Sequence, residues 1–455
     1  LSLLFVPPAK GGGMEIIMGV SSTILYGNCI EKNQPVSGTG HHKVVLKGKY
    51  KGQKSSFTLD EDILSKHMML VGGTGCGKST LFYHLFKQIR QNLSSEDVLI
   101  VFDTKGDFYK RFRKPEDYVI GNSKQYRDES KCWNIFREIL ADGWDEKDYT
   151  INTQEICKEL FEERTKGNSS NPFFPNAARD LLAALIISII KTGENDKEYR
   201  NDNFYNDSLK SSLDSSSVDD FIAALERFDE LRSVLSYIEG EGEQSQGVLS
   251  EMYSVIRDIL IGVFAERGGF SIRNFVRAKG GKVLFIEYDL AIGSVLTPIY
   301  RLFFDLAIKE ALGRTSSQGN VYLFCDEFKL LPNLQHIDDG VNFGRSLGLK
   351  VFAGLQSIEQ LFETYGEIKG RNLAAGFSSI FAFKANDVST RDYIRSLYGS
   401  NIILEQYQGM NKTLIEDKRE GNTVEDWDLN SLKVGEAVVG LPFEKPFKFY
   451  FDNFG

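Results

Sequence analysis

The sequence contains no apolar run long enough to cross a bilayer. Its longest such run, residues 181–190, is far shorter than the roughly 20 residues that a spanning helix needs. We therefore expect no membrane span in this chain, and we interpret the run as the core face of a helix.

Cysteines are few, and their spacing is not that of metal ligands or of a disulfide framework. The chain has five of them. They are Cys29, Cys76, Cys132, Cys157 and Cys325. This scatter disfavours structural disulfides and zinc sites and favours a reducing cytoplasm.

Basic residues are outnumbered by acidic ones. The chain has 54 Lys and Arg residues and 63 Asp and Glu residues, which gives a net charge of −9. A surface that coats nucleic acid without sequence preference needs an excess of cations, so any contact with nucleic acid must be local. The composition, 42% apolar and 26% charged over 455 residues, is that of a folded globular protein.

The first residues lack the features of a signal peptide. The chain does not begin with Met, and its apolar start has no charged region before it. Two interpretations stay open for residues 1–13: they precede the native start at Met14, or they are an ordinary flexible leader.

Short apolar runs and helical periods alternate in a pattern typical of a parallel α/β sheet. A compact run at residues 68–71 ends in a glycine loop, and apolar residues then recur at helical spacing. The expected strands are residues 43–50, 55–59, 68–71, 98–102, 282–288, 321–325, 350–354 and 379–385. A helix is expected at residues 298–312.

In residues 138–264 the apolar residues recur at helical spacing, which predicts an all-α insert. Within it, residues 193–217 are polar and rich in Ser and Asn, and we expect a mobile connector there. The predicted organisation is a leader at 1–42, the first part of a nucleotide-binding domain at 43–137, the all-α insert at 138–264 and the second part at 265–455.

The strongest motif is a phosphate-binding loop between a strand and a helix. It consists of Gly72, Gly73, Thr74, Gly75, Cys76, Gly77, Lys78, Ser79 and Thr80. Its glycines let backbone N–H groups wrap the phosphates of ATP, and the helix N-terminus adds positive charge. Lys78 would neutralise the terminal phosphates, and Ser79 would offer a hydroxyl to Mg²⁺.

Two adjacent acids, Asp326 and Glu327, follow the buried run at residues 321–325. The carboxyl end of a strand is where ligands bind in parallel sheets. We expect Asp326 to hold the Mg²⁺ shell and Glu327 to orient the attacking water.

Gln356 and Arg345 are two further candidates. Gln356 ends another strand and could sense the terminal phosphate or place the water, although a structural amide is an equal alternative. Arg345, taken alone, is a solvated helix residue.

Several ordered blocks resemble the coupling ATPases of bacterial conjugation and type IV secretion, the TraD/TrwB type. The resemblance covers roughly residue 43 to the C-terminus. It rests on the phosphate loop, Asp103–Asp107, residues 270–273 before 280–285, Asp326 with Glu327, and the stretch 344–366.

This resemblance implies a RecA-like P-loop motor interrupted by an all-helical domain. It also implies a homo-hexamer that passes DNA, expected to be single-stranded and bound without sequence preference, and partners that include a relaxase and type IV secretion components. In that family Arg345 would be an arginine finger, and Gln356 would couple the phosphate state to movement. Family members usually carry two N-terminal transmembrane helices, and we expect this chain to have lost them or to come from an untethered relative.

Two other functions stay open. One is a cytosolic DNA motor of the FtsK/HerA kind. The other is a recruitment platform, in which ATP binding holds an oligomer together and the helical domain docks relaxase or effector proteins. Glu327 discriminates between a motor and a platform, because a scaffold has little use for a carboxylate that activates water.

Overall fold

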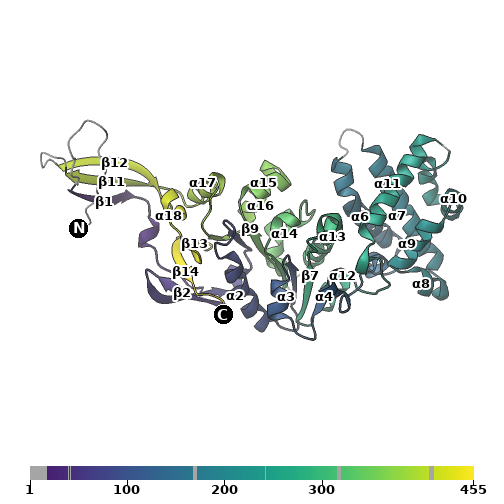
Figure 1. The fold of residues 1–455 in the computed structure, drawn as a ribbon, viewed down its shortest axis with the longest axis horizontal. Coiled ribbons are helices and arrows are strands. Elements are labelled where there is room, and N and C mark those ends of the chain that lie inside the picture. Colours follow the sequence, from purple (N-terminus) through teal and green to yellow (C-terminus); the bar gives the residue numbers. More distant parts are fainter. Residues whose placement is uncertain are drawn as a thin grey trace. The chain divides into compact units, whose positions relative to one another are not determined.

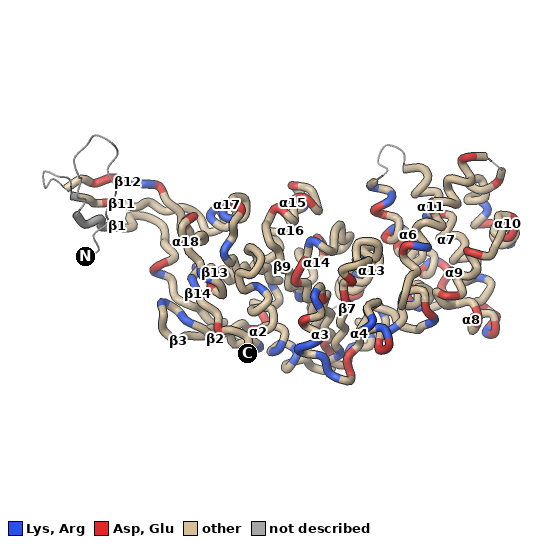
Figure 2. The backbone as a smooth tube through the Cα atoms, viewed as in Figure 1, with Lys and Arg blue, Asp and Glu red and all other residues tan. Residues whose placement is uncertain are grey.

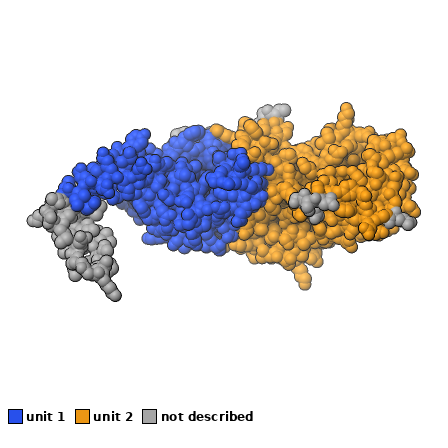
Figure 3. Space-filling model, turned by 90° about the horizontal axis from the view of Figure 1, so that it is seen from above, with its two compact units in different colours: residues 1–89, 354–455 blue, residues 90–353 orange. Residues whose placement is uncertain are grey.

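The computed structural model describes residues 18–38, 40, 42–167, 172–240, 242–314, 319–408 and 414–455. The chain divides into two compact units (Figure 3). The first unit comprises residues 1–89 and 354–455, and the second comprises residues 90–353. Residues 1–13, for which two interpretations were open, lie outside the described residues. The expected domain boundaries stay predictions.

The first unit holds a mixed sheet in the order β3-β2-β14-β13-β10-β4. Its strands are β2 (His42–Tyr50), β3 (Gln53–Asp60), β4 (Met68–Val71), β10 (Ser379–Ala382), β13 (Glu436–Gly440) and β14 (Phe447–Phe451). β10 and β4 are parallel, and the other pairs are antiparallel. Phe57 packs edge-on against Phe447 and Phe449, with ring centroids 5.2 and 4.9 Å away, so aromatic rings fill the core beside the sheet.

Short helices surround this sheet, and one long helix follows the glycine loop (Figure 1). They are η1 (Ile30–Lys32), α1 (Glu61–Leu64), α2 (Lys78–Gln91), α15 (Glu359–Tyr365), α16 (Glu367–Gly376), α17 (Val388–Leu397) and α18 (Asp426–Asn430). In α2, Leu81, Phe82, Leu85, Phe86 and Ile89 are all buried, which confirms the predicted helical period.

A separate three-stranded antiparallel sheet also belongs to the first unit. It has the order β1-β11-β12. Its strands are β1 (Met18–Tyr26), β11 (Ser400–Gln408) and β12 (Leu414–Asn422). β1 lies within the span expected to be a leader, and it pairs with β11 through Ile24 opposite Ile403. Sequence patterns did not predict this sheet.

The second unit contains an all-parallel sheet in the order β9-β8-β5-β7-β6. Its strands are β5 (Val98–Asp103), β6 (Tyr118–Ile120), β7 (Lys282–Glu287), β8 (Val321–Cys325) and β9 (Leu349–Leu355), the last two residues of which belong to the first unit. Every residue of β5, β8 and β9 is buried, as expected for strands covered on both faces.

Helices and turns connect these strands. They are α3 (Asp107–Phe112), α4 (Lys124–Arg127), α12 (Ile272–Ala278), α13 (Gly293–Leu312), η5 (Phe328–Leu330), α14 (Ile337–Phe343) and η6 (Gly344–Leu347).

Between residues 138 and 264 the described residues contain helices and no strand. The helices of this region are α5 (Ile135–Ile139), η2 (Leu140–Asp142), α6 (Glu146–Gly167), α7 (Phe173–Gly193), α8 (Lys197–Asn203), α9 (Asn206–Ser215), α10 (Val218–Glu226), η3 (Asp229–Tyr237), α11 (Glu243–Ile259) and η4 (Gly262–Phe264). α7 packs between α6 and α11 (Figure 1).

The expectation of a mobile connector at residues 193–217 was wrong, because α8 and α9 occupy most of it. Asp196 caps α8 by accepting a hydrogen bond from the N–H of Tyr199, which satisfies a free donor of the first turn. Leu209 and Leu213, one helical turn apart, are buried on the inner face of α9.

α7 is, among the described residues, the one helix long and apolar enough to cross a membrane by length and composition. The strictly apolar run at residues 181–190 did not indicate this candidate, because the helix continues through less apolar residues at both ends. Within its most apolar window, 67% of the residues are buried inside the structure. The predicted core face at residues 181–190 is confirmed, since Leu181, Leu182, Ile186 and Ile190 are buried.

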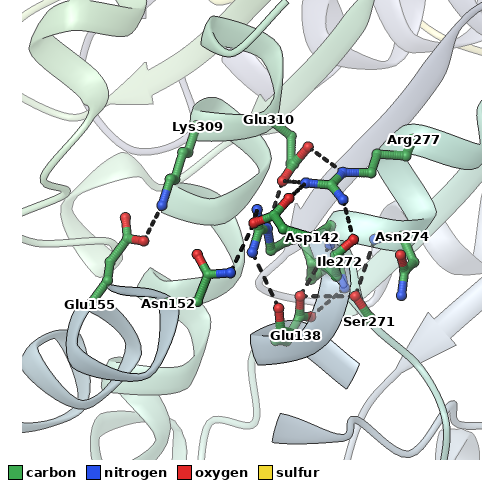
Figure 4. Close-up of polar contacts among 12 residues, drawn as sticks. Glu138, Asp142, Asn152, Glu155, Ser271, Ile272, Asn274, Arg277, Lys309 and Glu310 are labelled. Atoms are coloured by element: carbon green, nitrogen blue, oxygen red, sulfur yellow. Dashed lines mark hydrogen bonds and ion pairs between the residues drawn. The ribbon is translucent and has the colours of Figure 1, made fainter. Parts of the chain in front are cut away.

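A buried polar network joins the start of the helical region to the segment that follows it (Figure 4). The carboxylate of Glu138 accepts hydrogen bonds from Trp133 Nε1 and Ser271 Oγ and from the backbone N–H groups of Ile272 and Arg273. Burial raises the pKa of Glu138 to about 7. Nearby, Arg273 and Arg277 each pair with both Asp142 and Glu310. These contacts fix the junction between the helices and the parallel sheet.

Candidate nucleotide-binding site

The phosphate loop connects buried β4 to the first turn of α2 in the first unit. Three backbone hydrogen bonds hold it in place. The N–H of Gly72 donates to the carbonyl of Leu355 over 3.2 Å, and that of Gly73 donates to Lys384 over 2.9 Å. The carbonyl of Cys76 accepts a bond of 2.9 Å from the N–H of Gly435. The loop is therefore anchored at both ends before any ligand binds.

The loop conformation requires glycine at Gly75 and Gly77. Their φ angles are +74° and +115°, values that other residues rarely adopt. A Cβ atom on Gly77 would also lie 2.9 Å from the Cα atom of Gly435. Substitution at Gly77 would therefore both strain the loop and push it away from the turn before β13.

Lys78, the first residue of α2, reaches back over the loop. Its Nζ donates to the carbonyl oxygens of Gly72 and Gly73. The ammonium also lies 4.0 Å from the sulfur of buried Cys76. Burial raises the pKa of the Cys76 thiol, and the nearby Lys78 charge opposes this, so the thiol stays neutral beside the loop. Ser79 and Thr80 follow in the same helical turn and are half-buried.

Gln356 lies against the same loop. The hydroxyl of Thr74 donates to Gln356 Oε1 over 3.4 Å, and the backbone N–H of Gln356 donates to Gln360 Oε1 over 2.9 Å. The structure thus brings the predicted glutamine together with the phosphate loop in the first unit.

Asp326 and Glu327 follow β8 in the second unit. Thr104, just past the end of neighbouring β5, donates from its hydroxyl to Asp326 Oδ1 over 3.1 Å. Burial and then the nearby Asp103 carboxylate raise the pKa of Asp326 to about 7. Glu327 is half-buried and begins the turn η5, where its carbonyl accepts from the N–H of Leu330.

Thr104 and Asp103 were not predicted to act at the site. Asp103 is buried, and its Oδ2 accepts from the N–H of Tyr109 over 2.8 Å. Burial raises its pKa. The sequence signal was available in the block Asp103–Asp107, which directly follows a buried strand, but nothing local showed that β5 and β8 are neighbours.

Arg345 is exposed on the 3₁₀-helix η6 of the second unit. The turn closes through a bond from the N–H of Gly348 to the Arg345 carbonyl over 3.4 Å, with Gly348 at a φ of +86°. Lys78, Ser79 and Gln356 therefore belong to the first unit, whereas Asp326, Glu327 and Arg345 belong to the second.

Within each unit, the residues present suit one part of a magnesium nucleotide. The loop of the first unit offers the N-terminus of α2 and one ammonium, which suit phosphate oxygens. Asp326 carries a carboxylate whose ionisation is opposed by burial and by Asp103, and a bound divalent cation would relieve that cost. Hydroxyl and carboxylate oxygens, as on Ser79 and Asp326, are ligands that Mg²⁺ prefers.

The sequence matches one protein family over most of its length and resembles one curated protein. Residues 55–426 match the family model described as the type IV secretion-system coupling protein DNA-binding domain. The coupling protein TraD of Escherichia coli (strain K12) is 24% identical over 347 residues, which cover 73% of this chain and 45% of TraD. The chain thus spans about half the length of this curated relative.

Solved structures of related proteins have the same fold. The bacterial conjugative coupling protein TrwBdeltaN70, in an unbound form, has a TM-score of 0.71 at 21% identity and covers 97% of this chain and 95% of its own. TrwB with ADP and Mg²⁺ has a TM-score of 0.67 at 20% identity, covering 98% and 97% of the two chains. The predicted RecA-like P-loop fold is confirmed. With more than half of its residues in the family match, this chain belongs to the type IV secretion-system coupling protein family.

Proposed function

We propose that this chain is an ATPase that drives DNA, or DNA with bound protein, into a type IV secretion or conjugation system. The observation that carries the proposal is the anchored glycine loop with the Lys78 ammonium held over it and Gln356 beside it. A loop of this geometry serves to hold the β- and γ-phosphates of a nucleotide.

Each predicted residue has a distinct part in this proposal. Backbone N–H groups of the loop and Lys78 would hold the phosphates, and Ser79 and Asp326 would each offer an oxygen to Mg²⁺, which would neutralise charge on the phosphoryl group. Glu327 orients and polarises the attacking water. Gln356, bonded to Thr74 of the loop, senses whether the terminal phosphate is present.

The choice of nucleotide and metal follows from relatives. TrwB has been solved with a non-hydrolysable GTP analogue, with a non-hydrolysable ATP analogue, and with ADP and Mg²⁺. We propose ATP and Mg²⁺ for this chain, because its glycine loop with Lys78 suits nucleotide phosphates and its carboxylates suit a divalent cation.

Assembly and partners are also part of the proposal. We propose a homo-hexamer that surrounds single-stranded DNA without sequence preference, and that receives it from a relaxase at the cytoplasmic face of the membrane. The family is described by its DNA-binding domain. Because the net charge is −9, the DNA contacts must be confined to local groups of cations.

A recruitment platform is the second candidate, and one observation favours it. A cavity of about 1100 Å³ opens in the second unit among α6, α7 and η3. Its lining includes the small or apolar residues Ala183, Ala184 and Ile187 of α7 and the exposed Ile151 of α6. A groove of this kind can hold an amphipathic helix of another protein.

Turnover separates the two candidates. Lys78→Ala should abolish Mg²⁺-dependent ATP hydrolysis, because the loop loses its ammonium. Glu327→Gln should still bind ATP, as measured with a fluorescent analogue, but turn over about 10²- to 10³-fold more slowly. Nucleotide-dependent assembly with no hydrolysis in the unmodified chain would favour the platform.

DNA dependence tests the motor directly. Single-stranded DNA should stimulate ATP hydrolysis, and the stimulation should fade as salt rises, because binding releases counterions from the phosphates. Rates that stay flat across DNA concentrations at low salt, with the ring demonstrably assembled, would rule out DNA translocation.

A further inference from the structure

A second cavity, of about 590 Å³, opens in the first unit and is rich in lysine and tyrosine. It lies where the β2–β3 hairpin turn, β14 and the turn before β13 come together. The residues that give it its chemistry are Lys49, Lys51, Lys433, Lys448, Tyr50 and Tyr450. Figure 2 shows Lys and Arg positions along these strands.

Positive charge exceeds negative charge in this cavity, although the whole chain is acidic. Lys448 is already paired with Glu31 over 3.1 Å and with Asp428 over 2.7 Å. Lys49, Lys51 and Lys433 are exposed. Among the residues that the structure describes, none of these three lies in an ion pair.

Glu31 and Glu436 also line the cavity. Glu436 accepts a bond of 3.1 Å from the backbone N–H of Lys433, and among the described residues it forms no ion pair with a lysine ammonium. Three cations therefore remain available to an anionic ligand.

Aromatic rings lie beside these cations. The Nζ of Lys49 is 5.9 Å from the centre of the Tyr450 ring, and that of Lys51 is 5.3 Å from the centre of the Tyr50 ring. The hydroxyl of Tyr50 donates to the carbonyl of Asn33 over 2.6 Å and so fixes its ring. Cations that track phosphates next to rings on which bases can stack are the chemistry of single-stranded nucleic-acid sites.

One wall of the cavity is joined to the phosphate loop. Gly435, in the turn between Lys433 and Glu436, donates from its N–H to Cys76 of the loop over 2.9 Å. Its carbonyl accepts from the N–H of Phe451 over 2.8 Å. A ligand that moves this turn will therefore move a residue that holds the phosphate loop.

We propose that the cavity binds the phosphodiester backbone of single-stranded DNA through Lys49, Lys51 and Lys433, with Tyr50 and Tyr450 as stacking surfaces. This assignment of a DNA site rests on the proposed function, and it names the contact with DNA that the proposed function requires. Binding there reaches the phosphate loop through the turn at Gly435, which links DNA to the rate of ATP hydrolysis.

The test compares charge reversals on the assembled full chain. The probe is a fluorescent single-stranded oligonucleotide, and binding is followed by anisotropy over a salt series. Lys49→Glu combined with Lys51→Glu should weaken binding by at least about tenfold and lower the salt slope by roughly two. Tyr450→Ala should weaken it by about five- to tenfold with the salt slope unchanged. The matched control is Lys418→Glu, an exposed lysine on β12, which should bind like the unmodified chain.

The outcomes separate this inference from the proposed function. If the lysine pair variant binds DNA and is stimulated by it like the unmodified chain, the inference is overturned while the ATPase proposal stands. If the lysines are needed for DNA binding but no chain hydrolyses ATP, the inference stands and the motor fails. Binding to vesicles of anionic phospholipid, with none to DNA, would overturn the inference in favour of a lipid headgroup.

Discussion

The Thr104 hydroxyl and the Asp326 carboxylate, 222 residues apart in sequence, are joined by a hydrogen bond of 3.1 Å. The register of the sheet brings them together, since β5 and β8 are parallel with Phe102 opposite Cys325. The bond holds Oδ1 of Asp326 and so orients the carboxylate. Thr104 is therefore a positioning residue for the predicted Mg²⁺ ligand.

Thr104→Val should raise the Mg²⁺ concentration that half-saturates ATP hydrolysis by about tenfold, because a hydrogen bond to a charged group contributes roughly 1.5–3 kcal/mol. Thr104→Ser keeps the hydroxyl and should restore most of the Mg²⁺ affinity. Since the Thr104 bond lowers the pKa of Asp326, its loss should also move the acidic limb of the pH–rate profile to higher pH. A Val variant with an unchanged Mg²⁺ requirement and profile would leave Thr104 with a packing role alone.

Asp326→Asn should stabilise the chain at pH 8 in EDTA without nucleotide. Burial and Asp103 raise the folded-state pKa of Asp326 to about 7, above the roughly 3.9 of an unfolded Asp. The folded state then binds more protons between about pH 4 and pH 7, so stability falls as pH rises through that window. Asn cannot ionise and still accepts from Thr104.

We expect a gain of roughly 1–4 kcal/mol above pH 7, seen as a higher melting temperature, that disappears towards pH 4. A melting temperature at pH 8 no higher than that of the unmodified chain would contradict the argument.

The core of the sheet could be predicted from sequence because its strands are continuous apolar runs. The run at Val321–Cys325 is identical to β8, and β4 was predicted with the same bounds as observed. The phosphate loop could also be predicted, because its residues are consecutive in the sequence and no tertiary contact is needed to recognise them.

Other features depend on partners that no local pattern reveals. β12, Leu414–Asn422, is mostly charged and exposed, and it forms because it pairs with β11. Thr104 lies beside Asp326 because β5 pairs with β8, and no local sequence pattern shows that pairing. α8 and α9 were missed because their polar composition resembles a linker, although a few buried residues anchor them.

Asn206 is one such anchor, and its loss should be costly. Its Nδ2 donates to the carbonyls of Trp133 and Phe264, each over 2.9 Å, and its Oδ1 accepts from the N–H of Ile135 over 3.0 Å. The side chain is fully buried. Asn206→Ala leaves three buried backbone groups without a hydrogen-bond partner. It should lower the free energy of unfolding by on the order of 3 kcal/mol.

The control for this change is Asn203→Ala in α8. Among the described residues, its half-buried side chain donates to Tyr199 of the same helix and to no other group, so the cost in urea unfolding should stay near 0.5 kcal/mol or below, as roughly expected for surface positions. Equal losses in the two variants would show that Asn206 does not anchor the helical region.

Arg345→Ala should bind nucleotide almost normally and hydrolyse it poorly, if Arg345 completes the site of a neighbouring subunit. The residue is exposed on η6, where it can reach another copy, and its cation would neutralise charge on the transferring phosphoryl group. Such a finger contributes roughly 10³- to 10⁵-fold in rate in other P-loop proteins. Arg371→Ala, at an exposed arginine paired with Glu367 of its own helix, is the matched control and should keep full activity.

Mixing variants tests whether the contribution crosses a subunit boundary. Arg345→Ala and Lys78→Ala chains should each be inactive alone, because one lacks the finger and the other lacks the phosphate-binding ammonium. In a mixed ring, some interfaces pair an intact Lys78 with an intact Arg345 from the next subunit, so part of the activity should return. Mixed Lys78→Ala and Arg371→Ala rings calibrate how much activity partial occupancy allows. If mixed rings form and Arg345→Ala alone hydrolyses ATP at the normal rate, then Arg345 is a solvated residue and takes no part in hydrolysis.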